Sequence, residues 1–272
     1  MQDNTQPPPL FDRALLRRRR LRAIDQGADG VLLRLVIDEL QDRLEINTSR
    51  FPLALALGDP SPALGEAIAA TGKVDAVISG DLCHIPPRHG PAACLELDEE
   101  ALPFTPASFD LIVSALSLQW ANDLPGVLAR HRQALKPGGL FLGAMTGGRT
   151  LIELRTALQA AEQAVEGGVS PRVAPVADLR QMGDLLARAG FTSSVADLDS
   201  RILRYDGALD LMRDLRRFGA ANVLNRRRRQ PLRAETLAYA AEYYAEHFSD
   251  PDGRVRASFD FIYLSGWRGA SD

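Results

Sequence analysis

The chain has 272 residues, of which 46% are hydrophobic, so it can bury the core of one large domain or of one domain with a sizeable insertion. Its 32 basic and 35 acidic side chains give a net charge of -3, which argues against a nucleic-acid-binding domain of the usual basic kind. The two cysteines, Cys83 and Cys94, lack CxxC spacing. We therefore expect no disulfide framework and a reducing, cytoplasmic setting. No apolar run approaches the ~20 residues that span a bilayer, so an integral membrane protein is not expected.

The first fifty residues are expected to precede the core as a leader and two helices. Residues 1–9 are polar and proline-rich, which is typical of a disordered segment, and they lack the pattern of a secretory signal. Apolar residues recur near helical spacing among the arginines of FDRALLRRRRLRAID, which starts at Phe11, and again between Gly30 and Leu44. This spacing predicts a helix in each segment.

From Leu53 onward the chain alternates short apolar runs with helical stretches. Continuous apolar strands that are separated by crossover segments indicate a parallel sheet covered on both faces. The expected strands are LALAL (53–57), VDAVIS (74–79), AACLEL (92–97), FDLIVSAL (109–116) and GLFLGAM (139–145). The predicted fold class is therefore α/β, with a doubly wound, mostly parallel, Rossmann-like sheet.

A helical section interrupts the expected sheet near the end of the chain. An extended stretch after Gly190 and the run VRASFDFIYLSGWR (255–268) predict two further strands, and the residues between them are almost wholly helical in pattern. Helices inserted between two strands are expected to cover one edge of the sheet as a lid. The predicted organisation has the leader and N-terminal helices in 1–50, the core in 51–205 and 251–272, and the lid in 206–250.

Ligands of doubly wound sheets bind beyond the carboxyl ends of the strands, where the strand order reverses. A carboxylate after the second strand can accept hydrogen bonds from both hydroxyls of a ribose, and one after the third can accept from an adenine amine. Each acid also has a structural alternative, since Asp81 can cap a helix and LDEEALPF can form a solvated turn. The residues at the four strand ends are Gly58 and Asp59, Asp81 and Leu82, Leu97, Asp98 and Glu99, and Ser114, Ala115 and Leu116.

The segment LDEEALPFTPASFDLIVSALSLQWANDLPGVLARHRQALKPGGLFLGAMTGG resembles class I methyltransferases of the complex I assembly-factor branch. The likeness also covers FDRALLRRRR, TLIELRTALQAAE, EGGVSPRVAP, LMRDLRRFGAANVLNR and SFDFIYLSGW, and thus most of the chain. This branch is related to the biotin-pathway malonyl-carrier-protein methyltransferase, and its eukaryotic member is credited with hydroxylating an arginine of a complex I subunit. The resemblance implies a seven-stranded sheet, S-adenosylmethionine (SAM) as cofactor and a protein substrate such as a complex I subunit.

The resemblance also implies roles for the residues at the strand ends. Asp81 matches the ribose-binding acid of the family, and Asp98, with Leu97 and Glu99 beside it, matches the adenine contact. The residues from Ser114 to Leu116 match the segment that passes under the cofactor.

The first loop departs from the family's DLGCGxG pattern, because it has ALGDPSP from Ala56 to Pro62. Glycines in such a loop let the backbone approach a ligand closely, whereas proline fixes φ and removes an N–H donor. Alanine at position 56 also removes an acid that would anchor the methionine ammonium. The loop therefore predicts SAM binding that is weak, altered or absent.

Side chains beyond the strand ends provide candidate substrate contacts. Gln119 and Trp120, after the fourth strand, are expected to line a substrate pocket with Tyr243 and Arg226 of the lid. Packing within the lid is the alternative for Tyr243. The arginine runs 17–20 and 226–229 of the sequence fit either a solvated surface or a docking surface for an acidic partner. The four histidines show no metal-ligand spacing, so no metal site is predicted.

The leading functional hypothesis is SAM-dependent modification of a protein side chain. Three alternatives remain open from the sequence: hydroxylation of a complex I arginine, a non-catalytic assembly factor that has lost the cofactor, and carboxyl methylation of a carrier protein. The sequence indicates neither a catalytic residue nor an oligomeric state.

Overall fold

The computed structural model describes residues 8–25, 30–59, 61–83 and 93–271. Within these residues a seven-stranded sheet has the order β3-β2-β1-β4-β5-β7-β6. The first five strands pair in parallel, and β7 runs antiparallel to both β5 and β6. The strands are β1 (Phe51–Leu57), β2 (Val74–Asp81), β3 (Ala93–Glu96), β4 (Phe109–Ala115), β5 (Leu135–Gly147), β6 (Thr192–Tyr205) and β7 (Val255–Trp267). The predicted α/β class and the mostly parallel sheet are confirmed.

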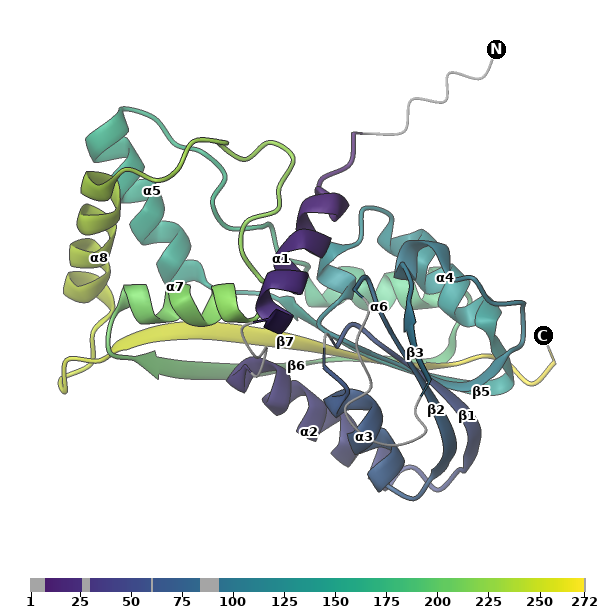
Figure 1. Cartoon of the computed structure of the whole chain (residues 1–272). Coiled ribbons are helices and arrows are strands. Elements are labelled where there is room, and N and C mark those ends of the chain that lie inside the picture. Colours follow the sequence, from purple (N-terminus) through teal and green to yellow (C-terminus); the bar gives the residue numbers. More distant parts are fainter. Residues whose placement is uncertain (1–7, 26–29, 60, 84–92, 272) are drawn as a thin grey trace, which may run out of the picture.

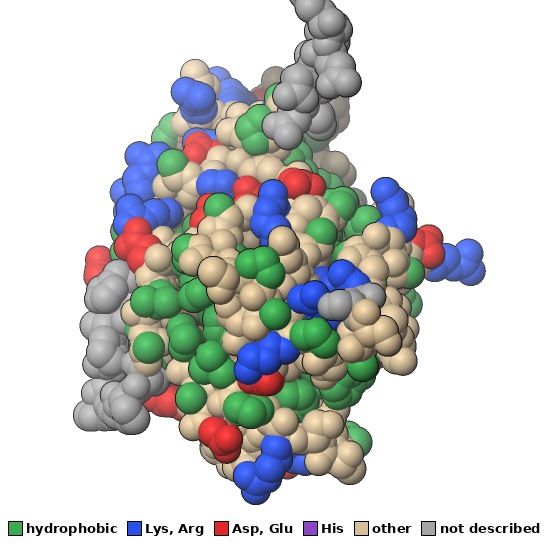
Figure 2. Space-filling view, turned by 90° about the vertical axis from the view of Figure 1, so that its right-hand side faces the viewer, with side chains coloured by type: hydrophobic (Ala, Val, Ile, Leu, Met, Phe, Trp, Pro, Cys, Tyr) green, Lys and Arg blue, Asp and Glu red, His purple; other side chains and the backbone are tan. Residues whose placement is uncertain are grey.

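Helices pack on both faces of this sheet, as the apolar strands require. One hydrophobic cluster joins α2, α3, α5, α7 and α8 to one face, and a second cluster joins α4 and α6 to the other. On the side of the molecule that Figure 2 displays, basic and acidic side chains are interspersed with hydrophobic ones. The helices are α1 (Arg13–Asp25), α2 (Val31–Ile46), α3 (Ala63–Ala70), α4 (Leu124–Ala134), α5 (Ile152–Glu166), α6 (Leu179–Arg188), α7 (Ala208–Arg217) and α8 (Ala234–Phe248).

The last two strands form a long hairpin whose far end carries the helices expected as a lid. The pairing of β6 with β7 runs from Thr192 opposite Trp267 to Tyr205 opposite Val255. In Figure 1 this hairpin extends to the left, where α7 lies along it and α5 stands beside α8. The helix α5 precedes the expected lid in sequence but packs with it, and Thr236 of α8 donates a hydrogen bond to Glu166 Oε1 at 2.8 Å.

The helix α1 lies over the carboxyl ends of the strands, between α7 and the ends of β2 and β3 (Figure 1). Leu16 on its buried face is fully inaccessible to solvent and belongs to a third hydrophobic cluster with Leu82 and Trp120. Three residues before the helix, Leu10 to Asp12, are tied to the segment 223–225 by backbone hydrogen bonds. The N-terminal helix is therefore an integral part of the edge at which ligands of this fold class bind.

Candidate functional site

The predicted ribose-binding acid, Asp81, is the last residue of β2 and lies in the interior. Its carboxylate forms an ion pair with the guanidinium of Arg20 on α1, and both side chains are at most 5% exposed. Oδ1 of Asp81 also accepts a hydrogen bond from the backbone N–H of Cys83 at 3.1 Å. Burial raises the pKa of Asp81, and the positive charge of Arg20 counteracts that rise. Arg20 thus pairs with the carboxylate that was predicted to bind a ribose.

The acids after β3 are paired with the same helix. Nη2 of Arg13 lies 2.5 Å from Oδ1 of Asp98, and Nη1 lies 3.1 Å from Oε1 of the buried Glu99. Asp98 also caps a short 3₁₀ turn, because its Oδ1 accepts from the N–H of Glu100 at 2.8 Å. One turn further along α1, Arg17 pairs with Glu96. The expected adenine contact is therefore held by arginine.

The backbone of the first loop packs closely against the segment after β4 at Gly58. This residue has φ +87°, as the family's glycine loop requires of its residues. A Cβ atom on Gly58 would lie 2.5 Å from Cβ of Ser117 and 2.6 Å from the carbonyl oxygen of Ala115. The glycine is therefore needed for close contact with the segment after β4.

Asp59 occupies the amide groups that a glycine loop would present to a ligand. Its Oδ2 accepts from the N–H of Leu64, at the start of α3, at 2.7 Å, and its Oδ1 accepts from the N–H of Ser61 at 2.6 Å. Free N–H groups at a helix start are the usual receptors for anions. Burial raises the pKa of Asp59 to about 6, although these hydrogen bonds favour the ionised form. The expectation for Pro60 lies outside the described residues.

The segment after β4 is closely packed. Ser114 and Ala115 are fully buried, and Ser114 Oγ lies 2.9 Å from Oγ of Ser117. Leu116 adopts a left-handed conformation with φ +50°, which turns its carbonyl toward two donors. That carbonyl accepts from Nε2 of Gln119 at 2.8 Å and from Nη2 of Arg20 at 3.5 Å. Arg20 therefore bridges the ends of β2 and β4.

Leu82 and Leu97, which were also predicted to bind the cofactor, pack at the same carboxyl ends of the strands. Leu82 is buried, and its carbonyl accepts a hydrogen bond from Nε of Arg17 at 3.0 Å. Leu97 is also buried and covers Gly80, where a Cβ atom would lie 2.5 Å from Cδ2 of Leu97. The edge is thus filled by side chains of the protein itself.

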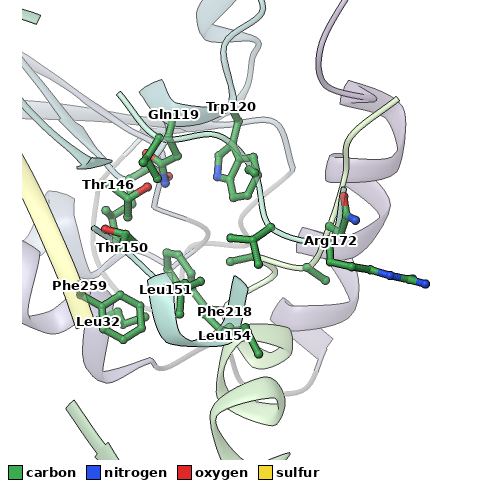
Figure 3. A pocket seen from close by; sticks show the side chains of 18 of the residues that line it. Leu32, Gln119, Trp120, Thr146, Thr150, Leu151, Leu154, Arg172, Phe218 and Phe259 are labelled. Carbon is green, nitrogen blue, oxygen red and sulfur yellow. The ribbon is translucent and has the colours of Figure 1, made fainter. Parts of the chain in front are cut away.

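A cavity of about 250 Å³ opens beside this edge. Gln119 and Trp120, both predicted as pocket residues, line it with Leu116, and Figure 3 places Gln119 and Trp120 at one end above Thr146 and Thr150. Apolar side chains form most of the remaining wall. They come from α2, α5, α7 and β7, and they include Leu32, Leu151, Leu154, Leu158, Met212, Leu215, Phe218, Phe259 and Phe261.

Polar atoms are few in this cavity. Oε1 of Gln119 is buried and has no hydrogen-bond partner in the described part of the chain. No acidic residue lines the cavity among the residues described. The bare amide oxygen of Gln119 can accept one hydrogen bond from a bound group, and the charged residues of the described lining are Arg172 and Arg216.

Two residues predicted for the substrate pocket lie elsewhere. Tyr243 does not line the cavity; it packs on α8 with its ring stacked on His247 at 3.9 Å between centroids. Arg226 is exposed and lines a separate, neighbouring groove. Arg13 and Arg20, in turn, were not predicted as site residues. Their signal was the spacing of Arg13, Arg17 and Arg20, which places all three on one face of a helix.

Known proteins resemble this chain over nearly its whole length. The mitochondrial arginine-hydroxylase NDUFAF5 of Danio rerio is 38% identical over 267 residues, which are 95% of this chain and 83% of that protein. The chain belongs to the NDUFAF5 family. Residues 86–143 match the family described as a methyltransferase domain. A malonyl-[acyl-carrier protein] O-methyltransferase of Xylella fastidiosa is 40% identical over 183 residues, which cover 67% of this chain and 59% of that protein.

A solved structure confirms the fold independently of sequence. The 1,6-didemethyltoxoflavin-N1-methyltransferase of Burkholderia thailandensis, solved with its substrate and S-adenosylhomocysteine, matches with a TM-score of 0.52 at 15% identity over 99% of this chain and 98% of that one. The predicted family and its class I methyltransferase sheet are thus confirmed. The chain is a methyltransferase-like enzyme, and the matched Burkholderia structure holds S-adenosylhomocysteine.

The residues at the cofactor edge, in the arrangement described, do not fit SAM. Asp81 and Asp98 are paired with arginines, Asp59 holds the amides at the start of α3, and Ala56 supplies no acid. A nucleoside would have to replace the arginines of α1. We therefore assign no chemical step to the cofactor at this edge.

Proposed function

We propose that the chain modifies a side chain of a protein partner, and that the partner is a subunit of respiratory complex I. The support comes from the family, whose Danio rerio member is named an arginine-hydroxylase. It also comes from the cavity beside Leu116, which lies where this fold class holds the reacting group. The part of the chain that the structure describes has no helix long and apolar enough to cross a membrane. We keep the cytoplasm as the proposed compartment, in which the chain would meet its partner before the partner is assembled.

In this proposal the chain's own residues bind and orient the target. Trp120 and Gln119 would hold the target at the end of the cavity, and the lid formed by 206–250 together with α5 would exclude water from it. Placement of reacting groups in one geometry supplies a large share of the acceleration in such enzymes.

We propose that this chain binds SAM weakly, because the cofactor would have to break a buried ion pair. Breaking a buried ion pair such as Arg20–Asp81 costs about 3–5 kcal/mol. A cofactor that recovers none of this cost would bind more weakly by roughly two to four powers of ten. Ribose hydroxyls at Asp81 would recover part of the cost.

A second function is favoured by the same ion pair. If α1 never leaves the edge, the chain is an assembly factor that keeps the fold without the cofactor. The distinguishing experiment is intact-mass analysis of candidate complex I subunits after incubation with the purified chain and SAM. The proposal expects a methyl mass gain with the wild type, for which SAM supplies the methyl group, and a large loss of that gain in Trp120→Ala. Absence of any gain, together with stable binding of the subunit, would contradict it and leave the assembly function.

A further inference from the structure

A groove of about 340 Å³ adjoins the cavity on the surface of the protein. The cavity and the groove share Arg172, Val173 and Pro175, so the loop that contains them forms the wall between the two. Figure 3 shows the side chain of Arg172 extending away from the cavity. The other groove residues come from α5 and the loop after it, the segment before α1 and the loop after α7, namely Leu10, Arg155, Gln159, Ser170, Pro171, Leu224 and Arg226.

The groove is positively charged. Three arginines line it, and no acidic side chain does so among the residues described. The charge of Arg172 is neutralised by Glu162, which lies 2.6 Å away and is only 1% exposed. Among the described residues, Arg155 and Arg226 have no such partner. There, Arg155 donates only to the carbonyl of Ala174, at 3.0 Å, and its buried Nε has no hydrogen-bond partner.

Arg226 is the arginine best placed to meet a partner. It is exposed, and it forms no ion pair with any residue that the structure describes. Its neighbours Arg227 and Arg228 are instead paired with Asp12 and Glu166. Those two ion pairs fix the loop, so Arg226 projects from an anchored backbone.

Apolar side chains complete the groove. Leu10 is 44% exposed at its rim, and Val173 and Leu224 lie in its wall. A surface with two unneutralised cations beside apolar side chains complements a segment that combines acidic and apolar residues. An extended segment bound there would pass directly beside the entrance to the cavity.

We propose that this groove docks an acidic polypeptide segment of the protein partner. That the docked partner is also the protein that is modified rests on the proposed function. The docking itself does not rest on it. Charge steers the encounter, and the shared wall then brings a neighbouring side chain of the partner to the cavity. Attraction between exposed charges weakens with salt, so docking should be salt-sensitive.

The test measures binding of a fluorescent peptide to the full-length chain by anisotropy, without cofactor or turnover. The probe alternates Glu and Gly around one central Phe, and its counterpart has Lys in place of each Glu. We expect the acidic probe to bind, the basic one not to bind, and the affinity of the acidic probe to fall with added salt. Arg226→Glu should weaken binding of the acidic probe by about tenfold at low salt, because one attraction becomes a repulsion.

The matched control is Arg50→Glu, which makes the same charge change at an exposed arginine directly before β1, at the amino ends of the strands. It should leave the affinity within about twofold of wild type, since a distant surface charge is screened. Equal binding of both probes, or an equal loss in both variants, would overturn the proposal. A third outcome would also overturn the proposal: the chain self-associates, Arg226→Glu abolishes this self-association, and the acidic probe does not bind. The groove would then bind a second copy of the chain. Probe binding without any mass gain on a partner would retain the groove and contradict only the proposed function.

Discussion

Arg20 of the N-terminal helix and Asp81 at the end of β2 form an ion pair from which solvent is almost wholly excluded. The same guanidinium also reaches the carbonyl of Leu116 at the end of β4. One side chain therefore closes the point of the sheet at which the strand order reverses, between the neighbouring strands β1 and β4. In a protein of this fold that point is where a nucleoside would bind. If Asp81 is the predicted ribose-binding acid, the docking of α1 and the binding of a cofactor compete for one carboxylate.

The buried Asp59 makes the free energy of unfolding depend on pH. Because burial raises its pKa in the folded state to about 6 from 3.8, the folded state holds this proton more tightly than the unfolded state. The stabilising contribution of Asp59 is therefore present below pH ~4 and is lost as the pH rises through ~6. We predict that Asp59→Asn, which keeps a carbonyl acceptor for Leu64, is more stable than wild type near neutral pH. Urea unfolding across this pH range measures the difference, which should shrink toward low pH.

A variant that replaces the acid without preserving the acceptor provides the control. Asp59→Ala removes the cap at the start of α3 and should be less stable than Asp59→Asn by about 1 kcal/mol. If the stability of Asp59→Asn followed the same pH curve as wild type, Asp59 would not be the titrating group.

His131 of α4 is fully buried, and its ring centroid lies 5.5 Å from that of Phe141 in β5. Neither ring nitrogen has a hydrogen-bond partner in the part of the chain that the structure describes. Burial lowers the pKa of His131 from 6.5 to about 3, so it stays neutral in the folded state while it takes up a proton in the unfolded state. Because of His131, the protein loses folding stability as the pH falls from ~6.5 toward ~3.

We predict that His131→Leu raises the free energy of unfolding by about 1–3 kcal/mol at neutral pH, because two unpaired buried polar atoms are removed. The gain should increase on acidification. Chemical unfolding at two pH values is sufficient to measure both effects. A His131→Leu protein less stable than wild type at both values would show that the ring nitrogens are satisfied in solution.

Sequence patterns were sufficient to predict the sheet, and the reason is the burial of its strands on both faces. The apolar run FDLIVSAL predicted a strand over 109–116, and β4 spans Phe109–Ala115. The start of β5 was less predictable: the run GLFLGAM predicted a strand over 139–145, yet β5 begins four residues earlier, at Leu135. A register shift between Phe109 and Leu111 of β4 accommodates this irregular start.

The closure of the cofactor edge could not be predicted from the motifs alone. Arginines in a run are usually solvated, and indeed Arg18 is exposed, whereas Arg20 two residues later is buried. Which arginine turns inward depends on where α1 lies relative to Asp81, and that placement follows from contacts between residues 61 positions apart. The substitutions in the first loop predict weakened cofactor binding, which stays a prediction, and they did not reveal that Asp59 itself would cap α3.

The most direct test of the account is a calorimetric titration of S-adenosylhomocysteine into wild type, Arg20→Ala and Arg18→Ala. If α1 competes with the cofactor, Arg20→Ala should bind at least about tenfold more tightly than wild type, since Asp81 becomes available. Arg18→Ala, a change on the same helix without contact to an acid of the edge, should match wild type. Arg13→Ala, which releases Asp98, serves as a second variant if Arg20→Ala does not fold. Unchanged or weaker binding in both Arg20→Ala and Arg13→Ala would contradict the account.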